Sequence, residues 1–335
     1  MKELISKLRD KRDLTADEAG SAMKKMMCGD ASEDEMREFL LALKEKGESP
    51  VEIASLAKVM REYSTKVSPE VGGTLVDMCG TGGDGSHTFN ISTAAMFVVA
   101  GDGVPVAKHG NRSITSKSGS ADVLEALGAN IQLPPERIKS SIEEVGVGFM
   151  FAPAHHPAMK HVMPVRKKLG VRTVFNILGP LTNPANADAQ LMGVFDPELT
   201  ETLAEVFKIL GLKRALVVHG EPGLDELSTF GKSRVSELKD RKVRTYEVDP
   251  SEYGFSGSQL SVGCTAEENA RLIRGILEGK VEGGDRDIVL LNAAGGLMVA
   301  GVADDLKEGL KMASSTVDSG RASNKLVEFI EYTNR

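Results

Sequence analysis

Two strand–loop–helix units follow each other directly in this chain, and their polar loops restrict its fold more than any other stretch. The first unit begins with an apolar run, Gly73–Cys79, that predicts a buried strand. The glycine loop Gly80–Gly85 comes next, and Asn90–Thr93 then leads into a helix expected over Ala94–Ala100. A strand that passes through a loop into a helix is the repeating unit of α/β folds.

The second unit repeats this arrangement with basic residues beside its loop. Its predicted strand, Val104–Ala107, ends in Lys108–Ser113, and the loop Ile114–Ser120 leads into a helix that begins at Ala121. A helix N-terminus presents free backbone N–H groups and the positive end of the helix dipole, so it suits a phosphate group. The cations beside the loops are Lys108, Arg112 and Lys117. The two units therefore predict a site for a phosphate-bearing ligand.

The glycine loop also matches the dinucleotide-binding pattern G-x-G-x-x-G, at Gly80, Gly82 and Gly85. That class of site needs an acidic residue at the end of the next strand, where it bonds the ribose hydroxyls. The next strand ends in Lys108 instead, and Asp84 inside the loop would repel a pyrophosphate unless a metal ion intervened. A loop that only makes a tight turn would explain the glycines but not the cations beyond them. A phosphate site of another kind is therefore favoured.

Length and charge limit the classes of protein that this sequence can represent. The chain has 335 residues, which at roughly 150 residues per domain predicts two domains. The formal net charge is −7, so we expect no nucleic-acid surface, and the cations near Lys108 form a local feature. The three cysteines are far apart without metal-ligand spacing, and we find no signal peptide and no apolar run long enough to span a membrane. A cytoplasmic protein that binds no membrane is expected.

The first 66 residues show helical patterns only, and we expect a small all-helical domain over 1–66 that serves packing or dimer contact. Capping signals predict helix starts at Thr15, Ser32 and Ser49. Val67–Gly73, with a proline and two glycines, is the expected linker to an α/β domain over 73–335.

Strands and helices continue to alternate through the α/β domain. Further predicted strands are Ile131–Leu133, Val147–Phe151, Ala215–Val218 and Val243–Val248. Further predicted helices are Pro135–Val145, Pro197–Leu210, Thr265–Gly279 and Asp287–Ala300. This alternation predicts a mostly parallel central sheet flanked by helices, with ligands bound at the carboxyl ends of the strands.

The segment 152–183 interrupts the alternation and carries three histidines and several cations. Its helical pattern near 157–185 predicts a helix that crosses back to the small domain and completes it. His155, His156 and His161 lack the spacing and the partner acid of a metal site. Each of these residues fits a solvated helix face as well as it fits a ligand site.

Adjacent carboxylates, Asp225 and Glu226, follow the predicted strand Ala215–Val218. Hard oxygen ligands of this kind suit Mg²⁺, which keeps several waters and is often shared with substrate phosphates. Such a pair is usually solvated surface, but its position after a strand that leads toward phosphate loops favours a metal site.

Together these motifs resemble the anthranilate phosphoribosyltransferase family of tryptophan biosynthesis, over nearly the whole chain. The matching parts are Gly80–Asp84, Asn90–Thr93, Lys108–Ser113, His156–Pro184 and Gly223–Glu226. The resemblance implies an enzyme that transfers the phosphoribosyl group of phosphoribosyl pyrophosphate (PRPP) to the amine of anthranilate, with Mg²⁺, in a cleft between the two domains. It also implies a homodimer.

The resemblance assigns residues to three parts of the site. It implies that PRPP is bound by Gly80, Gly83, Asp84, Thr88, Asn90, Ile91, Ser92, Thr93, Lys108, His109, Gly110, Asn111, Arg112, Ser113, Ile114, Thr115, Ser116 and Ser120. It implies that anthranilate is bound by Gly80, Asn111, Arg166, His109 and His156, and that Mg²⁺ is held by Ser92, Asp225 and Glu226. No residue is expected to act as acid or base, because an arylamine is already neutral at pH 7.

Two other functions stay open on the sequence alone. A nucleoside phosphorylase of the same architecture would use phosphate as the nucleophile and would need neither Arg166 nor the Asp225–Glu226 pair. A non-enzymatic relative could bind nucleic acid through a basic groove, which the net charge of −7 disfavours.

Overall fold

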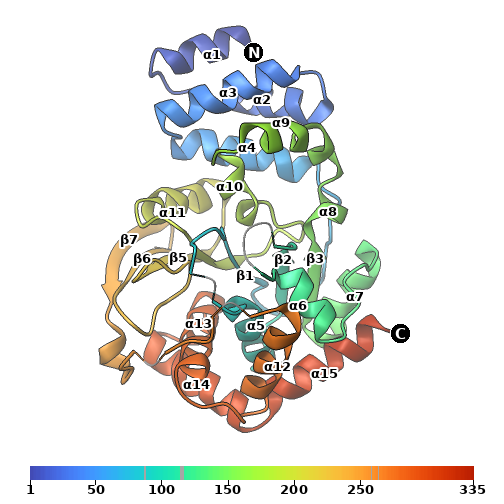
Figure 1. Ribbon diagram of the computed structural model, residues 1–335, viewed down its shortest axis with the longest axis vertical. Helices are drawn as coiled ribbons and strands as arrows, with labels where there is room; N and C mark the ends of the chain where they lie inside the picture. Colours follow the sequence, from blue (N-terminus) through green and yellow to red (C-terminus); the bar gives the residue numbers. More distant parts are fainter. Residues whose placement is uncertain (87, 114–116, 258, 263) are drawn as a thin grey trace.

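The computed structural model describes residues 1–86, 88–113, 117–257, 259–262 and 264–335. A layer of helices lies at one end of the molecule and an α/β body occupies the rest (Figure 1). The N-terminal helices are α1 (Lys2–Arg9), α2 (Ala16–Cys28), α3 (Glu33–Lys46) and α4 (Pro50–Glu62). The side chains of Thr15, Ser32 and Ser49 cap α2, α3 and α4, so these predicted helix starts are confirmed.

Seven strands form one sheet in the order β3-β2-β1-β4-β5-β6-β7. They are β1 (Val76–Gly80), β2 (Val106–Gly110), β3 (Val147–Phe151), β4 (Ala189–Gly193), β5 (Arg214–Gly220), β6 (Ser233–Lys239) and β7 (Lys242–Val248). The first five are parallel, and β6 and β7 extend the sheet antiparallel, which confirms the mostly parallel sheet. The chain builds β2 and β3 on one side of β1 and β4 on the other. Ligands of such sheets bind where the order reverses, at the carboxyl ends of β1 and β4.

Helices flank the sheet. Those of the α/β body are α5 (Ile91–Gly101), α6 (Ser120–Ala126), α7 (Pro135–Val145), α11 (Leu199–Leu210), α12 (Ala266–Leu277), α13 (Gly284–Ala300), α14 (Leu306–Asp318) and α15 (Arg321–Thr333), with a 3₁₀ turn at Pro250–Tyr253. Alternate strand residues face opposite sides. Leu191 belongs to the apolar core that contains α5 and α13, whereas its neighbour Met192 belongs to the core that contains α11.

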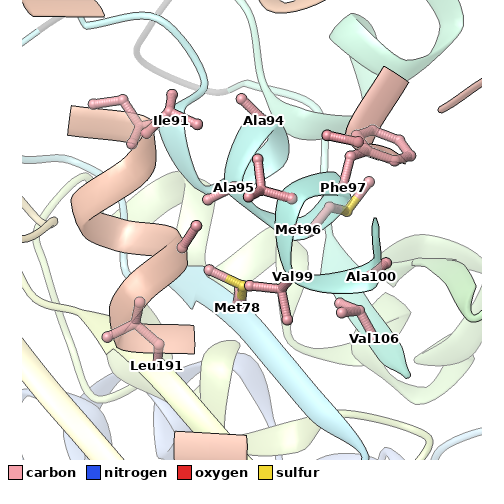
Figure 2. Close-up of a cluster of buried hydrophobic side chains, with 14 of the residues drawn as sticks. Met78, Ile91, Ala94, Ala95, Met96, Phe97, Val99, Ala100, Val106 and Leu191 are labelled. Carbon is pink, nitrogen blue, oxygen red and sulfur yellow. The ribbon is translucent and has the colours of Figure 1, made fainter. Parts of the chain in front are cut away.

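Helix α5 lies in the centre of the first core. Figure 2 shows Met78 of β1 beside Val99 of α5, together with Phe97 and Ala100 of the same helix. All seven residues from Ala94 to Ala100 are buried. Each large apolar side chain that is fully buried contributes roughly 1.5–3 kcal/mol. The helix is therefore held firmly on β1, which fixes its N-terminus at the carboxyl edge of the sheet.

The segment between β3 and β4 crosses to the N-terminal helices. It carries α8 (Ala152–His155), α9 (Met163–Leu169), α10 (Phe175–Leu178) and 3₁₀ turns at Pro157–His161 and Pro180–Thr182. Helix α9 packs on α3, and α10 packs on α4. Val165 and Leu178 share one apolar core with Leu40 and with Phe207 of α11. The core of the N-terminal helices is thus continuous with the core on one face of the sheet.

Several elements differ from those predicted. Ile131–Leu133 is not a strand, because Pro134 and Pro135 follow at once and cannot donate to a sheet ladder. Strands β4 and β6 and helices α14 and α15 were not predicted from the sequence. The polar residues of β6 and the direct entry of β4 from an irregular segment gave weak strand signals. None of the helices in the described ranges is both long and apolar enough to cross a membrane.

Candidate active site

The glycine loop after β1 is held against the backbone that carries Asp225. The Gly82 N–H donates to Asp225 Oδ2 at 2.8 Å, and the Thr81 N–H donates to the Gly193 carbonyl at 2.9 Å. This approach requires glycine at the ends of β1 and β4. A Cβ on Gly80 would lie 2.3 Å from Asp225 Oδ2, and one on Gly193 would lie 1.5 Å from the Asp225 carbonyl oxygen. The two strand ends and Asp225 therefore form one rigid unit.

The start of α5 meets Glu226 and Lys108. The Ser92 N–H donates to Glu226 Oε1 at 3.1 Å. Lys108 is 2% exposed, and its Nζ donates to Ser92 Oγ at 3.1 Å and to the Met78 carbonyl. Lys108 makes these two hydrogen bonds within the described residues, and an ammonium group has three N–H donors. One N–H of Lys108 is thus left for an anionic ligand.

The two acids fit a divalent cation. Burial raises the pKa of Asp225, and the neighbouring Asp84 carboxylate raises it further. Burial and the charge of Asp225 likewise raise the pKa of Glu226, which Lys108 opposes. No three His, Cys, Asp or Glu side chains of the described residues converge as a complete metal site. A hard cation held here would take its other ligands from the Ser92 hydroxyl and from substrate oxygens.

Other residues of the first loop bond mainly to their neighbours. The Ser86 hydroxyl donates to Asp84 Oδ2 at 2.5 Å, and the Ser86 N–H donates to Asp84 Oδ1 at 3.2 Å. Thr88 forms an isolated antiparallel bridge with Val262. Ile91 and Thr93 are buried in the first turn of α5.

The charge of Arg112 is balanced by two acids on the following helix, α6. Its guanidinium donates to Asp122 Oδ1 at 2.9 Å and to both oxygens of Glu125, at 2.5 and 2.9 Å. The guanidinium also lies 5.6 Å from the Phe151 ring centroid. The backbone N–H of Arg112 donates to Asn111 Oδ1 at 2.8 Å. Glu125 and then Asp122 raise the pKa of Arg112. Arg112 therefore shapes the loop after β2 more than it adds free positive charge.

The other predicted residues of the second loop lie around Arg112. Gly110 ends β2, the Ser113 N–H donates to Asp122 Oδ2 at 3.1 Å, and Ser120 begins α6. Ile114, Thr115 and Ser116 lie outside the described residues.

His109 and His156 lie together, with ring centroids 5.1 Å apart. His109 Nδ1 is 3.2 Å from the Gly179 carbonyl. Within the described part of the chain, the Nε2 atoms of both rings are buried without a hydrogen-bond partner. Burial lowers the pKa of His109 well below its usual value and that of His156 to about 4, so both rings are neutral at pH 7. Buried polar atoms are normally paired, so this pair marks a place for a ligand group.

Arg166 on α9 is a half-buried cation without a counterion. No carboxylate of the described residues lies within ion-pair distance, and its hydrogen-bonding contact there is the Met163 sulfur at 4.0 Å. Its guanidinium lies 5.5 Å from the Phe175 ring centroid, and burial lowers its pKa. A partly buried guanidinium without a carboxylate partner is stabilised most by a ligand carboxylate that accepts two parallel hydrogen bonds from it.

Three further side chains support the site without a local sequence signal. Arg172, between α9 and α10, donates to the Gly83 carbonyl and lies 4.0 Å from the Phe195 ring centroid. Asn269 and Ser118 bond each other at 2.7 Å beside Asn90. Their partners are distant in sequence, so no spacing in the chain could have indicated them.

Comparison with known proteins gives a consistent result. The family model described as "Glycosyl transferase family, a/b domain" matches residues 72–323, and "Glycosyl transferase family, helical bundle domain" matches residues 2–64. An anthranilate phosphoribosyltransferase from Methanocorpusculum labreanum is 52% identical over 98% of this chain and 96% of its own length.

Solved structures of similar proteins agree in fold. The anthranilate phosphoribosyltransferase of Thermus thermophilus has a TM-score of 0.94 and 45% identity, over 99% of both chains. The enzyme of Saccharomyces cerevisiae in complex with PRPP and Mg has a TM-score of 0.88 and 29% identity, over 99% of this chain and 97% of that one.

Proposed function

Because the chain belongs to the anthranilate phosphoribosyltransferase family, we propose that it transfers the phosphoribosyl group of PRPP to the amine of anthranilate. The products are N-(5-phosphoribosyl)anthranilate and pyrophosphate, and the reaction is a Mg²⁺-dependent step of tryptophan biosynthesis. One observation carries the proposal. The start of α5, Lys108 and the Asp225–Glu226 pair meet where the strand order of the sheet reverses.

PRPP is proposed to bind across the loops that follow β1 and β2. The residues assigned to it are Gly80, Gly83, Asp84, Thr88, Asn90, Ile91, Ser92, Thr93, Lys108, His109, Gly110, Asn111, Arg112, Ser113, Ile114, Thr115, Ser116 and Ser120. Ser92, Asp225 and Glu226 are assigned to Mg²⁺, which when bound neutralises charge on the departing pyrophosphate. The S. cerevisiae relative is in complex with PRPP and Mg, which supports PRPP and Mg²⁺ as the ligands of this site.

Anthranilate is proposed to bind between the loops that follow β1 and β2 and the segment between β3 and β4. The residues assigned to it are Gly80, His109, Asn111, His156 and Arg166. The amine lone pair forms the new C–N bond at the anomeric carbon, the C–O bond to pyrophosphate breaks, and the nitrogen then loses one proton. Arg166 holds the carboxylate, and no side chain is required as acid or base. This chain would accelerate the reaction by alignment and by positive charge near the leaving group.

A PRPP-dependent loss of anthranilate fluorescence tests the proposal. The chain contains no Trp and only 4 Tyr, so its own emission interferes little. We expect loss only when PRPP and Mg²⁺ are both present. The competing nucleoside phosphorylase function predicts no such loss, and instead release of a free base from a nucleoside with inorganic phosphate. The transferase is favoured by the buried acid pair and by Arg166, which has no carboxylate partner among the residues that the structure describes.

The domain division, oligomeric state and location are proposed with the function. Residues 1–66, completed by 157–185, are assigned to a helical domain, and residues 73–335 to the α/β domain. The packing of α9 on α3 and the limits of the two matching family models support this division. We assign a homodimer, which light scattering can test, and a cytoplasmic location, which the free thiols of all three cysteines support.

A further inference from the structure

Two asparagines lie buried inside C-terminal helices. Asn269 on α12 is 1% exposed and Asn292 on α13 is 0% exposed. Asparagine is unfavourable within a helix, because its side chain competes with the backbone for hydrogen bonds. Burying its amide group is also costly unless the donors and acceptors find partners. An apolar side chain would avoid both costs at either position. The hydrogen-bond partners of the two amides therefore indicate what these asparagines do.

Asn269 joins the two phosphate loops. Its Oδ1 accepts the Asn90 N–H at 3.1 Å, directly before α5. Its Nδ2 donates to Ser118 Oγ at 2.7 Å, shortly before α6, and to the carbonyls of Cys264 and Thr265 at 3.3 and 3.2 Å. The Ser118 hydroxyl in turn donates to Asn90 Oδ1 at 3.2 Å. The loops come from separate strand–helix units, and this side chain of a third element sets their separation.

Asn292 holds the loop that carries Asp225 and Glu226. Its Oδ1 accepts the Leu227 N–H at 2.9 Å, and its Nδ2 donates to the Leu227 carbonyl at 3.0 Å. A further bond to the Ile288 carbonyl, at 2.9 Å, anchors the amide to its own helix. Leu227 directly follows Glu226. Asn292 of α13 therefore fixes both the N–H and the carbonyl group of the residue next to the acid pair.

Resting on the proposed function, we propose that Asn269 and Asn292 are positioning residues for two separable parts of the site. Asn269 sets the distance between the loops that hold the PRPP phosphates. Asn292 sets the direction of the Asp225–Glu226 pair that holds Mg²⁺. Neither amide has to touch a substrate. Each acts through the backbone or hydroxyl groups that it bonds.

Calorimetry with PRPP separates the two roles. The affinity for PRPP at saturating Mg²⁺ and the Mg²⁺ concentration that half-saturates PRPP binding are measured for each variant. Asn269→Ala is expected to weaken PRPP roughly tenfold, with the Mg²⁺ requirement within about twofold of wild type. Asn292→Ala is expected to raise the Mg²⁺ requirement roughly tenfold, with PRPP affinity at saturating Mg²⁺ nearly kept.

Conservative and control variants keep the test decisive. Asn269→Asp and Asn292→Asp retain the oxygen that accepts the backbone N–H, and burial beside carbonyl oxygens keeps the new carboxyl group protonated, so its O–H replaces one amide donor and each variant should restore part of its own effect. The control Ser141→Ala removes a buried hydrogen bond of 2.6 Å from the Ser141 hydroxyl to the Val147 carbonyl. Val147 is the first residue of β3 and so lies at the end of the strand that points away from the ligand loops. This control should lower the melting temperature and leave both binding quantities unchanged.

The outcomes distinguish the inference from the function on which it rests. The inference is overturned if both alanine variants change the two quantities alike, or if they lose only thermal stability as Ser141→Ala does. If an alanine variant does not fold, its aspartate partner decides by the same criteria. Wild-type protein that binds PRPP with Mg²⁺ but never consumes anthranilate would refute the transferase, while the variants still decide the positioning roles.

Discussion

Replacing Arg166 with alanine should raise the anthranilate KM strongly and leave PRPP binding almost unchanged. Removing one partner of a buried charge pair costs about 2–5 kcal/mol of binding. Arg166 is only half-buried, so solvent screens part of this interaction and the lower half of the range applies. About 2–3 kcal/mol corresponds to a KM increase of roughly 30- to 150-fold.

The assay is anthranilate fluorescence at saturating PRPP and Mg²⁺, with Lys167→Ala as the matched control. Lys167 is the next residue of α9, carries the same charge and is exposed, so its loss should change KM less than about twofold. Arg166→Lys should restore the affinity only in part, because an ammonium group cannot make the two parallel bonds of a guanidinium.

The melting temperature adds an independent check. Since Arg166 has no counterion among the described residues, its removal leaves no buried charge unpaired, and the alanine variant should melt within a few degrees of wild type. An unchanged anthranilate KM in Arg166→Ala, or wild-type use of aniline as efficient as that of anthranilate, would refute the assignment.

Three other perturbations test neighbouring parts of the site. Asp225→Asn combined with Glu226→Gln should lower turnover at least about a hundredfold while the fold survives, since the neutral amides bind Mg²⁺ weakly; wild-type rate and wild-type Mg²⁺ dependence would contradict it. Lys108→Ala should weaken PRPP about tenfold or more in calorimetry, and anthranilate far less, because a charged hydrogen bond contributes about 1.5–3 kcal/mol; equal losses for both ligands would make Lys108 structural. The depressed pKa of His156 predicts that this side chain contributes a loss of folded-state stability as pH falls from 6.5 toward about 4, because the unfolded chain takes up its proton there and the folded chain does not; His109 adds to this effect, and the raised pKa values of Asp225 and Glu226 oppose it. The contribution of His156 to the slope is at most about 1.4 kcal/mol per pH unit, and His156→Asn should remove that contribution, so that in urea titrations the variant loses stability less steeply, or gains it more steeply, than wild type as pH falls; parallel curves for the two proteins would contradict this cause.

Local signals allowed much of the fold to be predicted. The predicted starts of α2, α3 and α4 each depended on a pair of side chains within three residues of one another, as at Thr15 with Glu18, and the structure has these caps. The strands β1, β2, β3 and β5 were apparent because each contains a short apolar run, and most of their residues are buried. The antiparallel strand β6 has two apolar residues, Val235 and Leu238, among five polar or charged ones, so its sequence resembles a loop.

The site was predictable in its residue types but not in its internal pairing. Ser92, Glu226 and Lys108 were each indicated by position at a strand or helix end, and the structure brings them within bonding distance. The pairing of Arg112 with Asp122 and Glu125 could not be foreseen, because both acids lie on the following helix. The bonds of Asn269 span about half of the chain, and no sequence pattern encodes such a distance.

A crystal structure with PRPP and Mn²⁺ would locate the proposed metal and phosphate sites together, because manganese gives an anomalous signal at its own position. We expect a manganese peak bound by Asp225 and Glu226, with PRPP oxygens completing its ligands and phosphate groups at the start of α5 beside Lys108. Manganese bound away from both acids, or PRPP bound away from the carboxyl ends of β1 and β2, would contradict this expectation.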